Sequence, residues 1–298
     1  MTDLLPQEWL TCMAAQPAEG GPDGATWARG LPRLIADLLG DWGLTPIGAS
    51  RTGRTAVVVP VQRDGGPLAL KVGWPHRESA GEHLALRRWA GDGAVRLIAA
   101  DPGRGALLLE ALDADHDLGE EWIDEACAVI GGLLRRLHVP ALPQLVRLSD
   151  VVRDQLDRAL AAPVTVPRRY LEQTASLLGD LTSQPGGDAT LIHTDLHFAN
   201  VLAGDREPWL AIDPKPMAGH PGYELLPVLR NRAEELGTGS ALRWSLRRRI
   251  EIVCEAAGID EDSARAWTIV RATLDATWAG QDPAARSLVI AIVKAMND

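Results

Sequence analysis

Two carboxylates and one amide follow one another within a short stretch of the second half of the chain. Asp195 lies in the run HTDLHFAN, Asn200 follows five residues later, and Asp213 ends the apolar run LAID. Phosphoryl transfer from ATP uses one carboxylate to receive the proton of the attacking hydroxyl. It uses an amide oxygen and a second carboxylate to hold Mg²⁺ on the phosphates. Hard oxygen ligands suit Mg²⁺, so this spacing favours ATP- and Mg²⁺-dependent phosphoryl transfer.

The surrounding sequence resembles a known family. H-x-D-x-x-x-x-N followed by I-D is similar to the catalytic loop and metal-binding aspartate of kinase-fold phosphotransferases. The longer run HTDLHFANVLAGDREPWLAIDPKPMAGHPGYEL resembles the aminoglycoside/hydroxyurea phosphotransferase family, particularly its streptomycin 6-phosphotransferase branch. From about residue 26 the resemblance continues through TWARGLPRLI, PLALKVGWP, LRRWAGDGAVRLIAAD, ALLLEALD and GLLRRLH.

The resemblance implies a role for each residue of the motif. Asp195 is expected to be the catalytic base, with Asn200 and Asp213 as the Mg²⁺ ligands. His193 is expected to brace the loop as a structural histidine. For His197 two roles remain open: it lines the acceptor cleft, or it caps the loop.

A lone lysine, Lys71, lies inside the apolar run PLALKVG. A buried ammonium is costly unless it has partners, and the resemblance supplies two: the ATP phosphates and an acid on the next helix. Glu78 and Glu82 lie four residues apart and therefore on one helical face. We choose Glu82 because it is expected to lie deeper in a helix over about 77–89.

The segment between Gly48 and Gly53 is the weakest match to a nucleotide-covering loop, because it departs from G-x-G-x-x-G. The hydroxyls of Ser50 and Thr52, with backbone amides, are still expected to meet phosphate oxygens. Taken alone, this segment would be an ordinary turn.

The periodicity predicts an α+β protein. β-branched runs and glycine turns predict antiparallel strands that end at about residue 112, and helical spacing dominates afterwards. The resemblance makes this a bilobal protein-kinase-like fold, in which the backbone of Glu110 and Leu112 contacts adenine. The expected parts are an N-terminal helix and loop extension (1–25), a small β-rich N-lobe (26–109), a hinge (110–112) and a larger, mostly helical C-lobe (113–298).

The charge of the chain is uneven. Up to Leu109 there are 11 acidic and 11 basic residues, whereas 29 acidic and 19 basic residues follow and account for the net charge of −10. This balance argues against a nucleic-acid partner. Either the acidic part is a solubilising surface, or it binds a cationic acceptor. The candidate acceptor-binding acids are Glu224, Glu234, Glu235 and Asp275.

The leading function is therefore an ATP-dependent O-phosphotransferase that inactivates a small, cationic, hydroxylated antibiotic of the streptomycin type. Two alternatives stay open: a kinase of another acceptor (hydroxyurea, another antibiotic or an amino-sugar metabolite), or a non-catalytic nucleotide-binding protein. Departures from the family pattern bear on the acceptor: Gly219-His220-Pro221 lacks the usual Asp, Thr194 replaces a bulky aromatic, and Lys215 adds a positive charge that suits phosphate.

The remaining expectations concern the cellular location, membrane association and oligomeric state of the protein. Three widely separated cysteines give no disulfide framework and fit a reducing cytoplasm. No apolar run approaches the roughly 18 residues needed to span a bilayer, so no membrane partner is expected. The expected state is a monomer or weak dimer.

Overall fold

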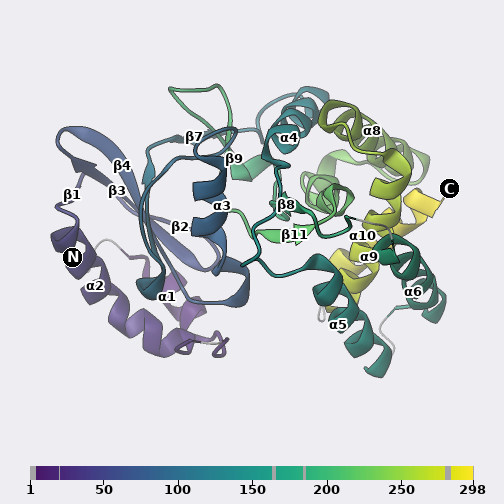
Figure 1. Ribbon diagram of the computed structural model, residues 1–298, viewed down its shortest axis with the longest axis horizontal. Coiled ribbons are helices and arrows are strands. Elements are labelled where there is room, and N and C mark those ends of the chain that lie inside the picture. Colours follow the sequence, from purple (N-terminus) through teal and green to yellow (C-terminus); the bar gives the residue numbers. More distant parts are fainter. Residues whose placement is uncertain (1–4, 20, 163–165, 184–185, 279–282, 298) are drawn as a thin grey trace. The chain divides into compact units, whose positions relative to one another are not determined.

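The chain divides into two compact units, Met1–Asp113 and Ala114–Asp298. The first contains the larger sheet and the second is mostly helical (Figure 1), which confirms the predicted α+β class. The boundary lies just after the predicted hinge. Residues 1–4 and 20 of the predicted extension lie outside the described residues. The computed structural model describes residues 5–19, 21–162, 166–183, 186–278 and 283–297.

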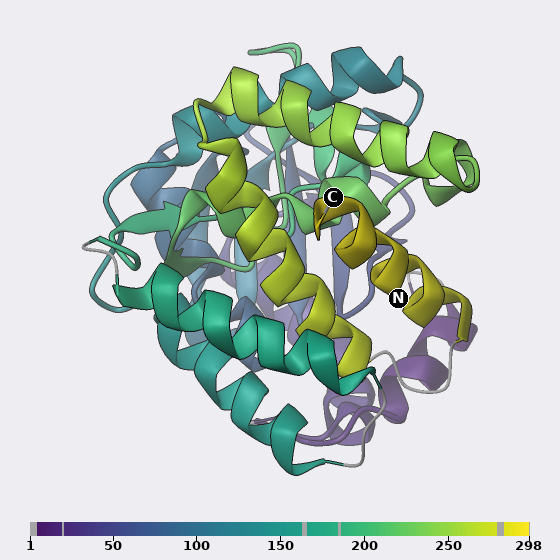
Figure 2. The same cartoon turned by 90° about the vertical axis from the view of Figure 1, so that its right-hand side faces the viewer.

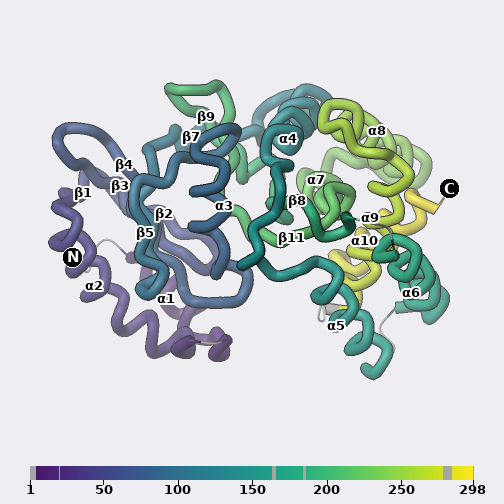
Figure 3. The backbone as a smooth tube through the Cα atoms, viewed as in Figure 1, coloured from purple at the N-terminus to yellow at the C-terminus, as the bar shows by residue number. Residues whose placement is uncertain are grey.

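The N-terminal unit contains a six-stranded antiparallel sheet in the order β1-β3-β4-β6-β5, with β2 paired to β3. Its β3–β4 hairpin (Figure 3) turns through Asp64 and Gly65, which have φ of 54° and 79°. Two positive φ angles are what a tight two-residue hairpin requires. The strands are β1 (Thr45–Pro46), β2 (Arg51–Thr52), β3 (Ala56–Arg63), β4 (Gly66–Gly73), β5 (Leu97–Asp101) and β6 (Ala106–Glu110).

Helix α2 (Gly24–Asp41) packs against one face of this sheet, and this packing determines which side chains of β4 are in the core. The Asp23 side chain caps the helix by accepting from Thr26 N. Buried apolar residues of α2 form one core with alternate residues of β3 and β4, including Leu70 and Val72. Because side chains alternate along a strand, Lys71 lies on the opposite face of β4. Before α2 lies the short helix α1 (Gln7–Ala14), within the span expected for the N-terminal helix.

The helix predicted over 77–89 is shorter than expected. Arg77–Ser79 form a single 3₁₀ turn, and α3 (Glu82–Trp89) begins only at Glu82. Glu82 is therefore the first residue of the helix rather than a residue deep within it. The expectation about its depth was wrong, although the choice of this glutamate over Glu78 agrees with the pairing described below.

The C-terminal unit contains two small sheets, ordered β10-β9-β7 and β11-β8, and helix α5 packs on β11. Helix α4 packs on α8, and α9 packs on α6 and α10 (Figure 2). No helix in the described ranges combines the length and apolar character needed to cross a bilayer. The helices are α4 (Ile123–Leu137), α5 (Leu148–Ala161), α6 (Arg168–Ser183), α7 (Leu226–Arg230), α8 (Ser240–Ala257), α9 (Glu261–Trp278) and α10 (Pro283–Asn297).

Strand β7 (Asp113–Asp117) corrects the expectation that strands end at about residue 112. It lies at the edge of its sheet and pairs with β9 (Val201–Ala203), which follows the loop 193–200. Its sequence, DADHD, has no apolar alternation, because an edge strand of this kind buries no apolar face and is protected by charge. Hydrophobic periodicity cannot reveal such a strand.

Two neighbouring glycines of α4 give a matched test of helix packing. A Cβ on Gly131 would lie 2.6 Å from Ala256 Cβ and 2.8 Å from Val253 O, whereas a Cβ on Gly132 meets nothing within 4 Å. We expect Gly131→Ala to lower stability by about 1–3 kcal/mol through overpacking. Gly132→Ala should raise it by up to about 1 kcal/mol through helix propensity. Urea unfolding of both variants measures this, and equal effects would contradict the close α4–α8 contact.

Candidate active site

The candidate catalytic residues are brought together by a small two-stranded sheet. Strand β8 (Thr190–Ile192) leads into the loop 193–200, and the chain returns through β9, β10 (Leu210–Ala211) and β11 (Met217–Gly219), which pairs with β8. The return places 213–215 against the loop, and Lys215 N donates to His193 O at 3.0 Å. Residues twenty positions apart in sequence are therefore neighbours.

His193 braces the loop from inside. It is fully buried, its Nδ1 accepts from Asp195 N at 3.2 Å, and its Nε2 lies 3.0 Å from Ile212 O. Because a backbone amide can only donate, Nδ1 must be the acceptor, and Nε2 carries the proton that it donates to Ile212 O. Burial lowers the pKa of His193, which agrees with a neutral ring. This is the structural role expected from the sequence.

Thr194 is held in a conformation that β-branched residues rarely adopt. Its φ is 62°, in the left-handed region, which costs about 1–3 kcal/mol. Three contacts fix it: its amide donates to Glu224 Oε1 at 2.8 Å, its hydroxyl donates to Lys215 O at 2.6 Å, and its carbonyl accepts from Arg271 Nη2 at 2.7 Å. The bend that presents the next residue, Asp195, is thus determined by its surroundings.

Glu224 anchors this bend and does not contact solvent. Its side chain is 0% exposed, Oε1 accepts from the amides of His193 (2.5 Å) and Thr194 (2.8 Å), and Oε2 lies 2.5 Å from Nε2 of His138. Burial by itself raises the pKa of Glu224, but the hydrogen bond and charge of His138 and the amide donors lower it below its ordinary value. The expectation that Glu224 binds the acceptor does not fit a carboxylate enclosed in this way.

Asp195 lies at the end of the bend, with 13% of its side chain exposed. Its Oδ2 forms an ion pair with Nζ of Lys215, and its backbone carbonyl accepts from Nδ2 of Asn200 at 2.9 Å. Lys215 therefore orients the carboxylate, and Asn200 holds the backbone that carries it. A general base needs this kind of fixed position.

Asn200 and Asp213 end up on adjoining backbone segments. Ile212 N donates to Asn200 O at 2.9 Å, so Asp213 lies one residue beyond the hairpin pairing of β9 and β10. Because the amide nitrogen of Asn200 is used by Asp195 O, its carbonyl oxygen is the end of the side chain suited to a cation. In the described ranges no three His, Cys, Asp or Glu residues cluster as a metal site. A hard cation that takes one or two protein oxygens fits this donor set.

Lys71 and Glu82 form a buried pair within the N-terminal unit. Nζ lies 2.6 Å from Glu82 Oε1, and the two side chains are 11% and 8% exposed. The structure thus pairs Lys71 with Glu82. The sequence alone did not settle whether Glu78 or Glu82 is the partner.

The predicted nucleotide-covering segment is a tight hairpin. Gly53 N donates to Ala56 O at 2.8 Å between β2 and β3, Ser50 is half-buried and Thr52 is exposed. The Nε1 of Trp9 in α1 donates to Gly53 O at 2.8 Å, so the N-terminal extension supports this turn. The spacing of the glycines gave no sign of that contact.

The predicted hinge residues end strand β6. The amide of Glu110 donates to Arg96 O at 3.1 Å, and its carboxylate accepts from Arg96 N at 2.7 Å. Leu112 is half-buried. The side chain of Glu110 therefore fastens a strand end, and an adenine contact of Glu110 or Leu112 stays a prediction.

The other predicted acceptor-binding residues are paired or exposed. Glu234 and Glu235 are exposed, and Glu235 pairs with Arg232 at 2.7 Å. Asp275 pairs with Arg230 at 3.1 Å.

His197 differs from those acids because its buried Nδ1 has no hydrogen-bond partner among the described residues. Burial lowers the pKa of His197. Asp195 raises it, and the positive charges of Lys215 and Arg230 lower it further. Arg230, the partner of Asp275, is one of the positive charges that lower the pKa of His197.

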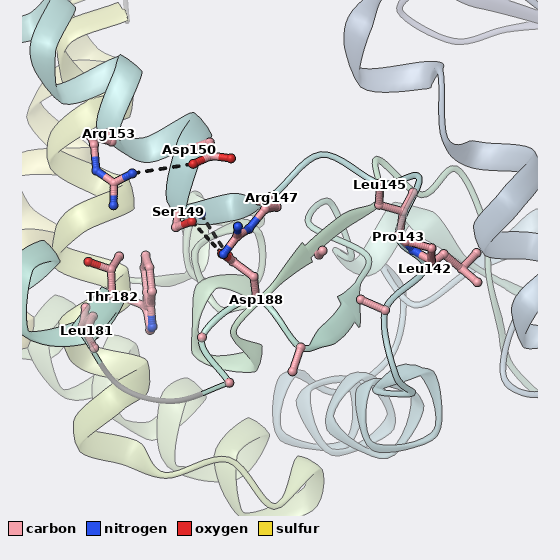
Figure 4. Close-up of a pocket in the computed structure, with 16 residues that line it drawn as sticks. Leu142, Pro143, Leu145, Arg147, Ser149, Asp150, Arg153, Leu181, Thr182 and Asp188 are labelled. Atoms are coloured by element: carbon pink, nitrogen blue, oxygen red, sulfur yellow. Dashed lines mark hydrogen bonds and ion pairs between the residues drawn. The ribbon is translucent and has the colours of Figure 1, made fainter.

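A large cavity lies apart from these residues. Its volume is about 620 Å³, and it is lined by the start of α5, the residues before β8 and Trp267. Figure 4 shows that Arg147 reaches Asp188 and Arg153 reaches Asp150 along its wall. None of the described residues that line it is a predicted site residue, so cavity size does not locate the candidate active site.

Sequence reasoning missed two residues that hold the site and the partner of a third. Arg271 reaches Thr194 O from α9, His138 reaches Glu224 from the end of α4, and Lys215 pairs with Asp195. Arg271 and His138 lie 77 and 86 positions from their partners, and no local spacing marks such contacts. Lys215 was noticed as a charge near the site, but its partner was not.

The fold defines the class of the protein. The crystal structure of choline kinase LicA from Streptococcus pneumoniae matches with a TM-score of 0.61 at 14% identity, over 90% of this chain and 99% of that one. The predicted kinase-like fold is therefore confirmed. The chain belongs to the family described as aminoglycoside/hydroxyurea antibiotic resistance kinase, which it matches over residues 41–283.

Two curated relatives show the range of this family. The chain is 40% identical to the streptomycin 6-kinase of Streptomyces glaucescens over 285 residues, which cover 91% of this chain and 92% of that protein. It is 43% identical to the hydroxyurea phosphotransferase of Kitasatospora aureofaciens over 274 residues, which cover 88% of this chain and 77% of that protein. The overall similarity does not choose between the two acceptors.

The buried carboxylate of Glu224 predicts a specific pH dependence of stability. Its pKa in the folded protein lies below the ordinary value of 4.5, so its stabilisation is complete above that value and is lost as the pH falls towards the folded pKa. We expect Glu224→Gln to lower the free energy of unfolding by about 3 kcal/mol at neutral pH, and by less below pH 4.5. Urea unfolding from pH 3 to 7 measures this.

The exposed Glu234 supplies the matched control. Glu234→Gln removes the same charge from the surface and should leave stability within about 0.5 kcal/mol of the unchanged protein. A Glu224→Gln effect that stayed constant across the pH range would show that the ionised carboxylate is not what holds the loop.

Proposed function

We propose that the protein is an ATP-dependent O-phosphotransferase that transfers the γ-phosphate to a hydroxyl of a small cationic antibiotic of the streptomycin type. The observation that carries this proposal is the arrangement of Asp195, Asn200 and Asp213 on one braced loop and its neighbouring hairpin. The family supports the acceptor class, since its described members act on aminoglycosides and hydroxyurea.

Asp195 performs the proton transfer in this proposal. Its carboxylate accepts the hydrogen bond of the acceptor hydroxyl and aims the oxygen at phosphorus. It receives the proton as the new O–P bond forms. Phosphoryl transfer is a loose process, so positioning contributes at least as much as proton removal. The hydrogen bonds that fix Thr194 and Asn200 keep this carboxylate in place.

Asn200 and Asp213 would hold Mg²⁺ through their side-chain oxygens. When bound, the cation neutralises charge on the phosphates of ATP. The chain's own contribution is to present a carbonyl oxygen and a carboxylate from adjoining backbone segments. The hydrogen bond of Asn200 Nδ2 to Asp195 O turns the oxygen of this amide outward.

The N-terminal unit contributes the remaining contacts to ATP. Lys71, oriented by Glu82, binds the phosphates, and the hydroxyls of Ser50 and Thr52 with nearby amides bind phosphate oxygens. The backbone of Glu110 and of Leu112 contacts adenine. The protein acts in the cytoplasm, where ATP is available, as a monomer or weak dimer.

Two observations bear on the acceptor. Asp275 and His197 are the predicted acceptor residues that we retain, since Asp275 pairs with Arg230 and the charge of Arg230 acts on His197. Hydroxyurea is the second candidate, because the hydroxyurea phosphotransferase is 43% identical to this chain, although the match covers 77% of that protein against 92% of the streptomycin 6-kinase. The non-catalytic alternative is disfavoured by the braced position of Asp195.

An acceptor panel tests the proposed function. Streptomycin, hydroxyurea and an amino sugar are offered with ATP and Mg²⁺, and ADP release is measured by a coupled assay. We expect streptomycin to give the highest kcat/KM. Asp195→Asn should lower kcat by about 10²–10⁴ with little change in ATP binding.

Asp205 provides the control for this variant, because it is exposed in the turn between β9 and β10. Asp205→Asn should turn over at the unchanged rate. The proposal would be wrong if Asp195→Asn kept a near-normal rate of transfer. If hydroxyurea were the best substrate, the proposed acceptor would be wrong but the proposed phosphoryl transfer would stand.

Asp213→Asn tests the metal assignment separately. Removing one negative ligand should raise the Mg²⁺ concentration that half-saturates binding of a non-hydrolysable ATP analogue, by about tenfold or more. The analogue is titrated by calorimetry at several Mg²⁺ concentrations, again with Asp205→Asn as the control. An unchanged Mg²⁺ dependence would remove Asp213 from the metal site.

A further inference from the structure

Lys215 places a positive charge directly against Asp195. Its Nζ forms an ion pair with Asp195 Oδ2, and its side chain is 30% exposed against 13% for Asp195. Lys215 is therefore the more exposed partner of the pair.

The fold holds the backbone of Lys215 as firmly as that of Asp195. Lys215 N donates to His193 O at 3.0 Å, and its carbonyl accepts from the hydroxyl of Thr194 at 2.6 Å. Pro214, which fixes its own φ, precedes it and is buried. The base of the side chain is thus fixed to the catalytic loop, and only the four-carbon stem can turn.

The reaction geometry brings the phosphoryl group within reach of this ammonium. A hydroxyl served by a general base lies about 2.6–3.2 Å from a carboxylate oxygen, and its oxygen lies about 3–3.5 Å from the phosphorus that it attacks. Lys215 touches the other oxygen of the same carboxylate. A flexible lysine stem then needs only a small rotation to contact an oxygen of the transferring group.

We propose, on the basis of the proposed function, that Lys215 is a further catalytic residue whose ammonium passes from Asp195 to the transferring phosphoryl group. The acceptor oxygen bonds to the γ-phosphorus, and the bond from that phosphorus to the β,γ-bridging oxygen breaks. ADP leaves with the bonding electron pair, and the acceptor proton moves to Asp195.

The charges explain why the ammonium changes partner. Before transfer, Lys215 balances the negative carboxylate of Asp195. As that carboxylate gains the proton it becomes neutral, whereas negative charge is concentrated on the equatorial oxygens of the phosphoryl group. The ammonium is therefore attracted more strongly to the phosphoryl group during transfer than before it, which is what accelerates a chemical step.

Three substitutions separate this role from a structural one. Lys215→Met keeps the stem and removes the charge, and Lys215→Arg keeps the charge. Lys294→Met makes the same change at an exposed position of α10. Each variant is assayed for acceptor phosphorylation, and its binding of ADP is measured by calorimetry with Mg²⁺, with and without fluoroaluminate, which mimics the transferring phosphoryl group.

We expect Lys215→Met to lower kcat by about 10²–10³, and to weaken the binding of ADP with fluoroaluminate by a similar factor. Binding of ADP alone should stay within about threefold, since the lysine meets only the transferred group. Lys215→Arg should recover most of both losses, and Lys294→Met should change neither.

The fluoroaluminate measurement decides between catalysis and positioning. A Lys215→Met variant that turned over slowly but bound ADP with fluoroaluminate normally would show that Lys215 only orients Asp195, and this would overturn the proposal. Because this measurement needs no acceptor, a wrong acceptor leaves it intact. If the unchanged protein itself did not bind ADP with fluoroaluminate, the proposed phosphotransferase function would fail, and the role of Lys215 with it.

Discussion

The catalytic loop depends on one buried carboxylate. Two consecutive amides, those of His193 and Thr194, point into the interior where the loop bends, and each would be costly if left without a partner. Glu224 accepts from both and is itself held by His138. The left-handed conformation of Thr194, the outward position of Asp195 and the contact of Lys215 with the loop all follow from this bend.

Buried side chains within the loop 193–200 fix its backbone. His193 is kept neutral by burial and spans the loop with both ring nitrogens. Phe198 is fully buried beneath Arg232 and Arg249, which anchors the middle of the segment between Asp195 and Asn200. The polar side chains can therefore face the reaction while the backbone that carries them is part of the core. Preorganisation of this kind is the main way in which a protein accelerates phosphoryl transfer.

The sequence predicted best those features whose pattern lies within a single helix, strand or loop. The motif around Asp195, the apolar pattern of α2 and β4, and the isolated Lys71 are local features, and the structure agrees with the elements they predicted. The supporting contacts were out of reach, because Arg271 lies 77 residues from Thr194 and a partner at that separation leaves no spacing to detect. The charged strand β7 was missed for a related reason, since it has no apolar face to give it a period.

Glu224 shows why charge counted along a sequence is a poor guide to an acceptor. The second part of the chain carries a large acidic excess, yet this acid is enclosed by donors, and Asp275 is paired with Arg230. Exposed charges farther away than about 10 Å are largely screened at moderate salt. In the proposed function, an acceptor at Asp195 meets the local balance set by Lys215, Arg230 and His197, and this balance is far less negative than the net charge. A cationic acceptor would then be recognised by a few acids placed beside that centre.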